Sequence, residues 1–132
     1  MIDGKKIVLV IDDDADILNI SAMKLERAGF AVETADSAIA GARVADRIKP
    51  DLILLDINMP GLNGTQEFLD LKNSKAMKDV PIAFFTNLTH PWPGLSGDHD
   101  KDAKELGAVA FIDKSRDLNT LDEVVKNILA SL

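Results

Sequence analysis

Cysteine is absent from this sequence of 132 residues, so disulfides, thiolate metal sites and cysteine nucleophiles are excluded. Long hydrophobic runs are absent too. The run "IVLVI" is far too short to cross a bilayer or to form the core of a signal peptide, and no later run is longer. Basic residues are fewer than acidic ones, 15 against 22, and the net charge of −7 argues against general affinity for nucleic acid or anionic membranes. We therefore expect a cytoplasmic protein.

The composition is that of an ordinary globular protein. Hydrophobic residues make up 46% of the sequence and charged residues 28%, which does not fit a disordered chain. No internal repeat, low-complexity tract or linker interrupts the sequence. We expect one domain over residues 1–132, long enough to bury a real core.

Short apolar runs alternate with segments of helical period. The apolar runs predict buried strands at 6–11, 30–34, 51–56, 81–86 and 108–113. Four helices are predicted at 15–28, from Ser37 as cap to Pro50, at 65–75, and from about 98–102 onward. A fifth helix is predicted at the end of the chain, where Thr120 and Glu123 form a capping-box pattern followed by an apolar stripe to Leu132. This alternation predicts an α/β fold, a doubly wound parallel sheet with helices on both faces.

Polar groups stand where the predicted strands end. They are Asp12 and Asp13, Asp56, Thr86 and Lys114. In such sheets the ligand site lies at the carboxyl ends of the strands, so these residues should meet in one crevice. Two unit charges about 4 Å apart repel by roughly 4 kcal/mol at an effective dielectric near 20. Gathered carboxylates therefore require positive charge, and oxygen ligands favour a hard cation such as Mg²⁺.

A divalent ion, a lysine and a hydroxyl around one aspartate would suit a phosphoryl group. The cations neutralise the phosphoryl oxygens, and the ionised aspartate is the nucleophile. Each residue alone has an ordinary explanation; Asp14 and Asp16, for instance, suit the positive end of the first helix. The four strand ends together, each with a required group, favour the functional interpretation.

Four stretches carry a resemblance to a known family: "IVLVIDDD", "DLILLDINMPGLNG", "PIAFFT" and "GAVAFIDK". Over about residues 5–131 the chain resembles the receiver domain of two-component response regulators. The resemblance implies a flavodoxin-like five-stranded sheet of order 2-1-3-4-5. It also implies a phosphorelay module that is not an enzyme, apart from catalysing its own aspartyl phosphorylation and dephosphorylation.

By that resemblance, Asp56 is the phosphoacceptor. Asp13 and Asp56 would bind Mg²⁺, or Mn²⁺ in its place, through their side chains. Asn58 would bind the ion through its backbone carbonyl, and Asp12 through a water.

The resemblance also assigns the switch and the partners. Thr86 and Lys114 would contact the phosphoryl oxygens. Phe111 matches the family's aromatic switch position, although a simple core phenylalanine explains it equally well. The phosphoryl donor would be a sensor histidine kinase or a histidine phosphotransfer protein, and the output a downstream protein target, without nucleic acid or membrane binding by this domain.

Two departures from the family pattern stand out. The family usually has Lys-Pro with a cis bond after the fifth strand, whereas this chain has Lys114-Ser115. A cis bond before a residue other than proline costs about 2.5–4 kcal/mol, so we expect the loop to follow another path. The connection after Thr86 is also long, and it contains Trp92, the only tryptophan. Trp92 either covers the sheet edge or anchors a partner.

Two other functions compete with the phosphoacceptor. One is a pseudo-receiver that binds partners without phosphorylation. The other is a hydrolase of the haloacid-dehalogenase type, but Asp16 stands where that family's motif requires Thr or Val, and the motif does not explain Asp56. The final predicted helix reaches the last residue, so the chain is either a stand-alone receiver or part of a longer regulator. The sequence names neither kinase, stimulus nor target.

Overall fold

Strands and helices alternate along the chain. The computed structural model describes residues 1–62, 65–87 and 99–132. In chain order its elements are β1 (Ile7–Ile11), α1 (Ala15–Arg27), β2 (Ala31–Ala35), α2 (Ala38–Ile48), β3 (Leu52–Leu55), α3 (Thr65–Lys72), β4 (Ile82–Thr86), α4 (His99–Leu106), β5 (Ala110–Asp113), α5 (Lys114–Asp117), the 3₁₀ turn η1 (Leu118–Thr120) and α6 (Leu121–Ala130).

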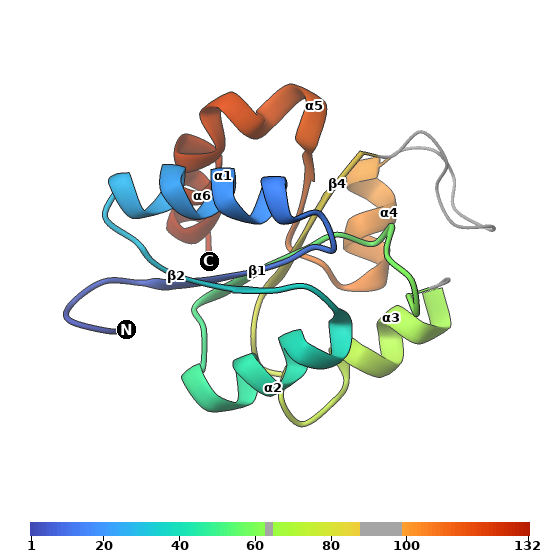
Figure 1. Cartoon of the computed structure of the whole chain (residues 1–132). Coiled ribbons are helices and arrows are strands. Elements are labelled where there is room, and N and C mark those ends of the chain that lie inside the picture. Colours follow the sequence, from blue (N-terminus) through green and yellow to red (C-terminus); the bar gives the residue numbers. More distant parts are fainter. Residues whose placement is uncertain (63–64, 88–98) are drawn as a thin grey trace.

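The five strands form one parallel sheet of order β2-β1-β3-β4-β5. The predicted fold class and strand order are confirmed. The order reverses next to β1, since β2 lies on one side of it and β3 on the other. A ligand crevice in such a sheet lies at the carboxyl ends of the strands on either side of this reversal. Figure 1 shows helices on both sides of the sheet.

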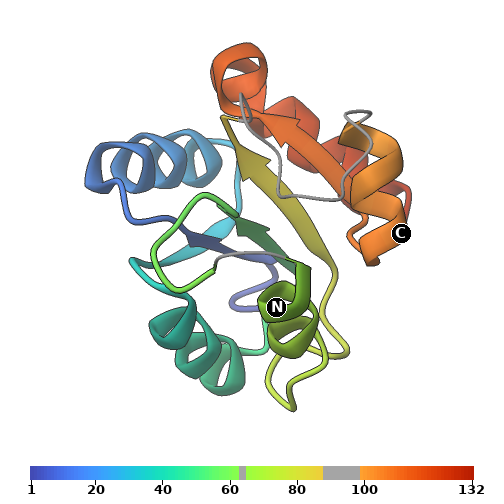
Figure 2. The same cartoon turned by 90° about the vertical axis from the view of Figure 1, so that its right-hand side faces the viewer.

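Side chains of the central strands alternate between two cores, as the two-residue period of a strand requires. In β1, Leu9 and Ile11 face the core covered by α2, α3 and α4, while Val8 and Val10 face the core covered by α1 and α6. Figure 2 shows α1 and α2 on opposite sides of the sheet. Burial on both faces explains why these strands are continuous apolar runs.

The first two helices begin at side-chain caps. The carboxylate of Asp14 accepts hydrogen bonds from the N–H groups of Asp16 and Ile17, at 2.9 and 3.3 Å. The hydroxyl of Ser37 accepts one from the N–H of Ala40, at 3.1 Å. Both caps satisfy backbone donors that a helix leaves free at its start. The predicted role of Asp14 at the first helix and of Ser37 at the second is confirmed.

The C-terminal region differs from the prediction. Thr120 has φ −115° and ψ 25° and caps α6 with no side-chain hydrogen bond, so the predicted capping box is wrong. The 3₁₀ turn η1 leads directly into α6 and takes Thr120 out of the extended conformation that a capping hydroxyl needs. Leu132 is 58% exposed, so the apolar stripe ends before it. None of the helices in the described ranges is long and apolar enough to cross a membrane.

Candidate functional site

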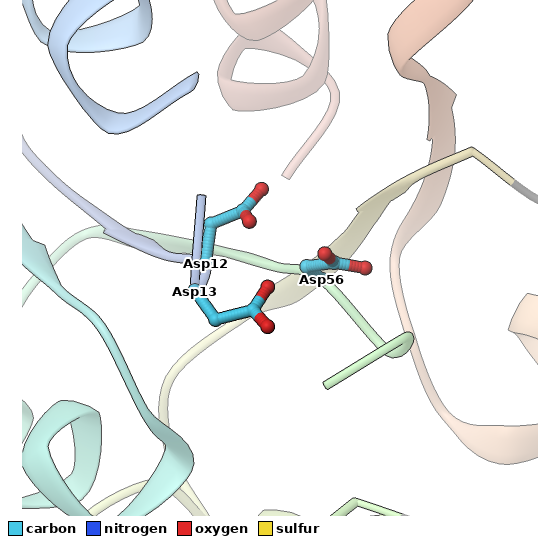
Figure 3. A group of neighbouring side chains, drawn as sticks. All are labelled: Asp12, Asp13 and Asp56. Atoms are coloured by element: carbon cyan, nitrogen blue, oxygen red, sulfur yellow. The ribbon is translucent and has the colours of Figure 1, made fainter. Parts of the chain in front are cut away.

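The predicted residues lie together at the carboxyl edge of the sheet. Asp12 and Asp13 directly follow β1, Asp56 follows β3, Thr86 ends β4, and Lys114 follows β5. Figure 3 shows Asp12 and Asp13 side by side, with the carboxylate of Asp56 beside them at the end of the neighbouring strand. Residues from four strand ends, far apart in the sequence, therefore lie at one edge because parallel strands place their carboxyl ends together.

Three carboxylates form the acidic part of the site. Asp12, Asp13 and Asp56 each offer an oxygen, and these oxygens lie within 4.8 Å of one another. Asp12 is fully buried and Asp56 nearly so, at 0% and 4% exposure, whereas Asp13 is exposed. The cluster thus opens to solvent on the side of Asp13.

Asp56 is held by three donors. Its Oδ1 accepts hydrogen bonds from the Thr86 hydroxyl and from the Asn58 N–H, both at 2.9 Å. Its Oδ2 accepts one from Lys114 Nζ at 3.0 Å. The carboxylate of Asp56 is therefore oriented by groups from two other strand ends and from the loop after β3.

Lys114 joins the two buried carboxylates. Its ammonium forms ion pairs with Asp12 and with Asp56, and the side chain is 8% exposed. Nζ also lies 5.7 Å from the centroid of the Phe85 ring, within the range of a cation–π contact. Burial acts to lower the pKa of Lys114, but Asp12 and Asp56 outweigh it and raise the pKa above its ordinary value. Lys114 is therefore a fixed cation.

Asp12 has a raised pKa, because burial outweighs the opposing hydrogen bonds and charge from Lys114 and the backbone of Asp14. Its Oδ1 accepts the N–H of Asp14 at 2.9 Å. Its Oδ2 forms an ion pair with the ammonium of Lys114, so this buried oxygen faces the one cation that the described residues place in the site.

The donor set fits a hard divalent cation. All three side chains offer oxygen, the chemistry that Mg²⁺ prefers. One ammonium faces three carboxylates, so the ionised site retains two negative charges, which one divalent ion would neutralise.

The backbone after β5 supplies residues that the sequence did not reveal. Asp113 caps the short helix α5, and its Oδ1 accepts the N–H and the hydroxyl of Ser115, at 2.9 and 2.6 Å. Asp117 Oδ2 accepts the N–H of Asp113 at 3.1 Å. The described residues contain no cis peptide bond. The chain passes from β5 directly into α5 at Lys114. The Asp-x-Ser spacing was the available signal, but it is common in ordinary turns.

Other predicted residues are placed as follows. Asn58 donates its N–H to Asp56 and its side-chain amide to the carbonyl of Asn87, at 3.3 Å. Phe111 is 9% exposed and lies in the core with α2, α3 and α4, paired in register with Phe84 of β4. Trp92 lies outside the described residues.

This sheet order with an acidic, lysine-containing carboxyl edge defines the class: a flavodoxin-like α/β domain with a site suited to a metal ion and a phosphoryl group. Residues 8–126 match the response regulator receiver domain, and the chain belongs to this family of two-component signalling proteins. The match favours the receiver over the haloacid-dehalogenase hydrolase.

Two curated relatives illustrate the family. The phosphate regulon transcriptional regulatory protein PhoB of Pseudomonas aeruginosa is 36% identical over 112 residues, which cover 83% of this chain and 45% of PhoB. Protein PilH of the same organism is 30% identical, over 95% of this chain and 98% of PilH. The chain spans less than half the length of several relatives that it matches: 45% of PhoB, 34% of the transcriptional regulator RpaA of Synechocystis, and 48% of the alkaline phosphatase synthesis regulatory protein PhoP of Bacillus subtilis.

Solved structures agree with the fold. The chemotaxis protein CheY4 of Vibrio cholerae superposes with a TM-score of 0.76 at 25% identity, over 95% of this chain and 99% of that one. A CheY-like receiver domain protein of Methanospirillum hungatei gives a TM-score of 0.77 at 26% identity, over 97% and 96% of the two chains.

Proposed function

We propose that this receiver domain is a phosphoacceptor, and that Asp56 takes a phosphoryl group in an Mg²⁺-dependent reaction. The observation that carries this proposal is the environment of Asp56, whose two carboxylate oxygens accept bonds from Thr86, Asn58 and Lys114 beside two further carboxylates. Three donors fix an ionised nucleophile in one orientation, which is the arrangement that in-line attack requires.

The donor is a histidine kinase or a histidine phosphotransfer protein. An oxygen of the Asp56 carboxylate forms a bond to phosphorus, and the bond from phosphorus to the donor's histidine nitrogen breaks. The product is an acyl phosphate on Asp56 and a free histidine. The chain catalyses only this reaction on itself and the later hydrolysis of the acyl phosphate.

Asp13 and Asp56 would hold the Mg²⁺ through their side chains, Asn58 through its carbonyl, and Asp12 through a water. The ion would supply positive charge to the phosphoryl oxygens. Lys114 and Thr86 contact those oxygens as well, because both already bond to the carboxylate that becomes phosphorylated. Mn²⁺ can take the place of Mg²⁺ at an all-oxygen site.

Phosphorylation then alters a protein-interaction surface. When Thr86 turns toward the phosphoryl group, its hydroxyl leaves Asp56 Oδ1, and Phe111 on the neighbouring strand follows. The output partner is a protein that recognises the altered surface near β4 and β5. Because the chain spans less than half of several relatives, the output of the whole protein is part of this proposal.

The test is phosphorylation by acetyl phosphate, followed by intact mass. The wild-type chain should gain one phosphoryl group in Mg²⁺ and none in EDTA. Asp56→Asn should gain none, whereas Asp46→Asn, which changes an exposed carboxylate on α2, should behave as the wild type. A phosphoryl gain that survives Asp56→Asn overturns the acceptor, and a full gain in EDTA overturns the metal requirement. No gain under any condition would favour the pseudo-receiver.

A further inference from the structure

The turn after β5 is closed by two reciprocal side-chain caps. Asp113 accepts the N–H and the hydroxyl of Ser115, two residues ahead, which closes the first turn of α5. Asp117 reaches back from the end of that turn to the N–H of Asp113. Arg116 in turn holds the Asp117 carboxylate through two bonds, at 3.0 and 2.8 Å. Lys114 is the first residue inside this closed turn.

The same turn is tied to the sheet beside Thr86. Asp113 is the register partner of Thr86 in the β4–β5 pair, and β5 is an edge strand. An edge strand leaves backbone donors without a strand partner, and Asp117 satisfies the one at Asp113. The backbone of Asp113 therefore links two of the three residues that donate to Asp56, with Thr86 beside it and Lys114 next in the chain.

We propose that Asp113, with Ser115 and Asp117, is a positioning residue that holds Lys114 over Asp56. In this chain Ser115 occupies the position after the lysine where the family usually has a proline. The inference rests on the proposed function.

The ion pairs of Lys114 cannot do this alone. Its partners Asp12 and Asp56 are the groups whose electrostatic environment changes when a metal ion binds or when Asp56 is phosphorylated. A lysine side chain is long and has many rotamers, so its reach is defined only if its backbone is fixed. The caps on α5 involve neither Asp12 nor Asp56, and they hold the backbone of Lys114 while its partners change.

The experiment compares two substitutions at one position. Asp113→Ala removes the cap acceptor, whereas Asp113→Asn keeps an acceptor and removes only the charge, since asparagine caps helices about as well as aspartate. The first readout is the metal-free NOE between the ε-methylene of Lys114 and the Phe85 ring. The second is the affinity for beryllofluoride in Mg²⁺, followed by ¹⁹F NMR. Ser37→Ala, which removes the equivalent cap of α2, is the matched control, because the hydroxyl of Ser37 accepts from Ala40 and not from a residue of the site.

We expect Asp113→Ala to lose the NOE and to bind beryllofluoride about tenfold more weakly, the size of one lost cap. Asp113→Asn should keep the NOE and bind within about twofold of the wild type. Ser37→Ala should lower stability and leave both readouts unchanged. If Asp113→Ala does not fold, Ser115→Ala decides instead, and it should weaken binding by about two- to threefold, because it removes one of the two bonds to Asp113.

The role of Asp113 would be overturned if the NOE and the beryllofluoride affinity were unchanged in Asp113→Ala, or in Ser115→Ala where Asp113→Ala does not fold. An equal loss in Asp113→Asn would also overturn it, since the charge rather than the cap would then matter. A wild type that fails to bind beryllofluoride would instead contradict the proposed function, and the NOE comparison would still decide whether the turn positions Lys114.

Discussion

The ammonium of Lys114 lies 3.0 Å from Asp56 Oδ2, and both side chains are almost fully buried. The same ammonium pairs with Asp12, so one cation serves two buried carboxylates from different strand ends. Removing one partner of a buried ion pair destabilises a protein far more than replacing both partners by apolar residues, because the remaining charge is left without compensation. The stability of the metal-free fold should therefore depend on Lys114.

Lys114→Met should lower the free energy of unfolding by about 2–4 kcal/mol in EDTA, because Asp12 and Asp56 would remain buried without a cation. Mg²⁺ should stabilise this variant more than the wild type, since the ion would then offset more uncompensated charge. Urea unfolding at neutral pH, with and without Mg²⁺, measures both effects.

Lys101→Met provides the control for that experiment. Lys101 forms an exposed ion pair with Glu105 on α4, at 4.0 Å, and such pairs contribute less than about 1 kcal/mol. If Lys114→Met were no more destabilising than Lys101→Met, the two buried carboxylates would not depend on the lysine.

Much of this architecture was predictable because it follows from local pattern. Continuous apolar runs identify strands that are buried on both faces, and their ends identify the edge where Asp12, Asp56 and Lys114 meet. The caps at Asp14 and Ser37 were predictable for the same reason, since each side chain bonds to an amide two or three residues ahead.

The turn at α5 was not predictable in this way. Its four residues are too few to show a helical period, and the bond from Asp113 to Asp117 has meaning only once β5 ends at the sheet edge. The capping box at Thr120 failed for a related reason. A capping hydroxyl needs an extended backbone, and the preceding 3₁₀ turn, which depends on how the chain returns from β5, removes it.

Gly41 lets α2 approach β1 closely. A Cβ added at Gly41 would lie 2.8 Å from Cγ1 and 3.3 Å from Cγ2 of Ile11, a fully buried side chain. Gly41→Ala should therefore destabilise the fold by about 1–3 kcal/mol. Ile11→Ala removes the opposing atoms, so the double variant should lose less stability than the sum of the two single losses. Urea unfolding of all four proteins completes the cycle, and strictly additive losses would contradict the close approach.

The reciprocal caps at α5 should make part of the stability sensitive to acid. Hydrogen bonds from Arg116, opposed by burial, hold the pKa of Asp117 below its ordinary value, and those from Ser115 do the same for the pKa of Asp113. A depressed folded-state pKa contributes stability that is present above the unfolded pKa of about 3.9 and is lost as pH falls through the folded value.

Asp117→Asn should therefore be less stable than the wild type at neutral pH, and the difference should shrink as the pH falls below the ordinary carboxyl range. Urea unfolding at a series of pH values measures this. Arg116→Met should reproduce part of the change, because it removes the main cause of the depressed pKa of Asp117. A difference between Asp117→Asn and the wild type that stays constant with pH would show that the carboxylate is not held in this way.

Asp13 is the exposed member of the acidic cluster. Its substitution therefore tests whether the three carboxylates repel one another, without opening a cavity in the core. Asp13→Asn should raise the melting temperature in EDTA, because it relieves repulsion from Asp12 and Asp56 worth a few tenths to about 1 kcal/mol at a solvent-exposed position. The same change removes one of the proposed Mg²⁺ ligands, so the stabilisation by Mg²⁺ should fall. Thermal unfolding with and without Mg²⁺ measures both, with Asp46→Asn as the control, since its carboxylate lies on α2, in an ion pair with Lys49. A variant that is less stable than the wild type in EDTA, with an unchanged response to Mg²⁺, would mean that the carboxylate of Asp13 neither repels its neighbours nor binds the ion.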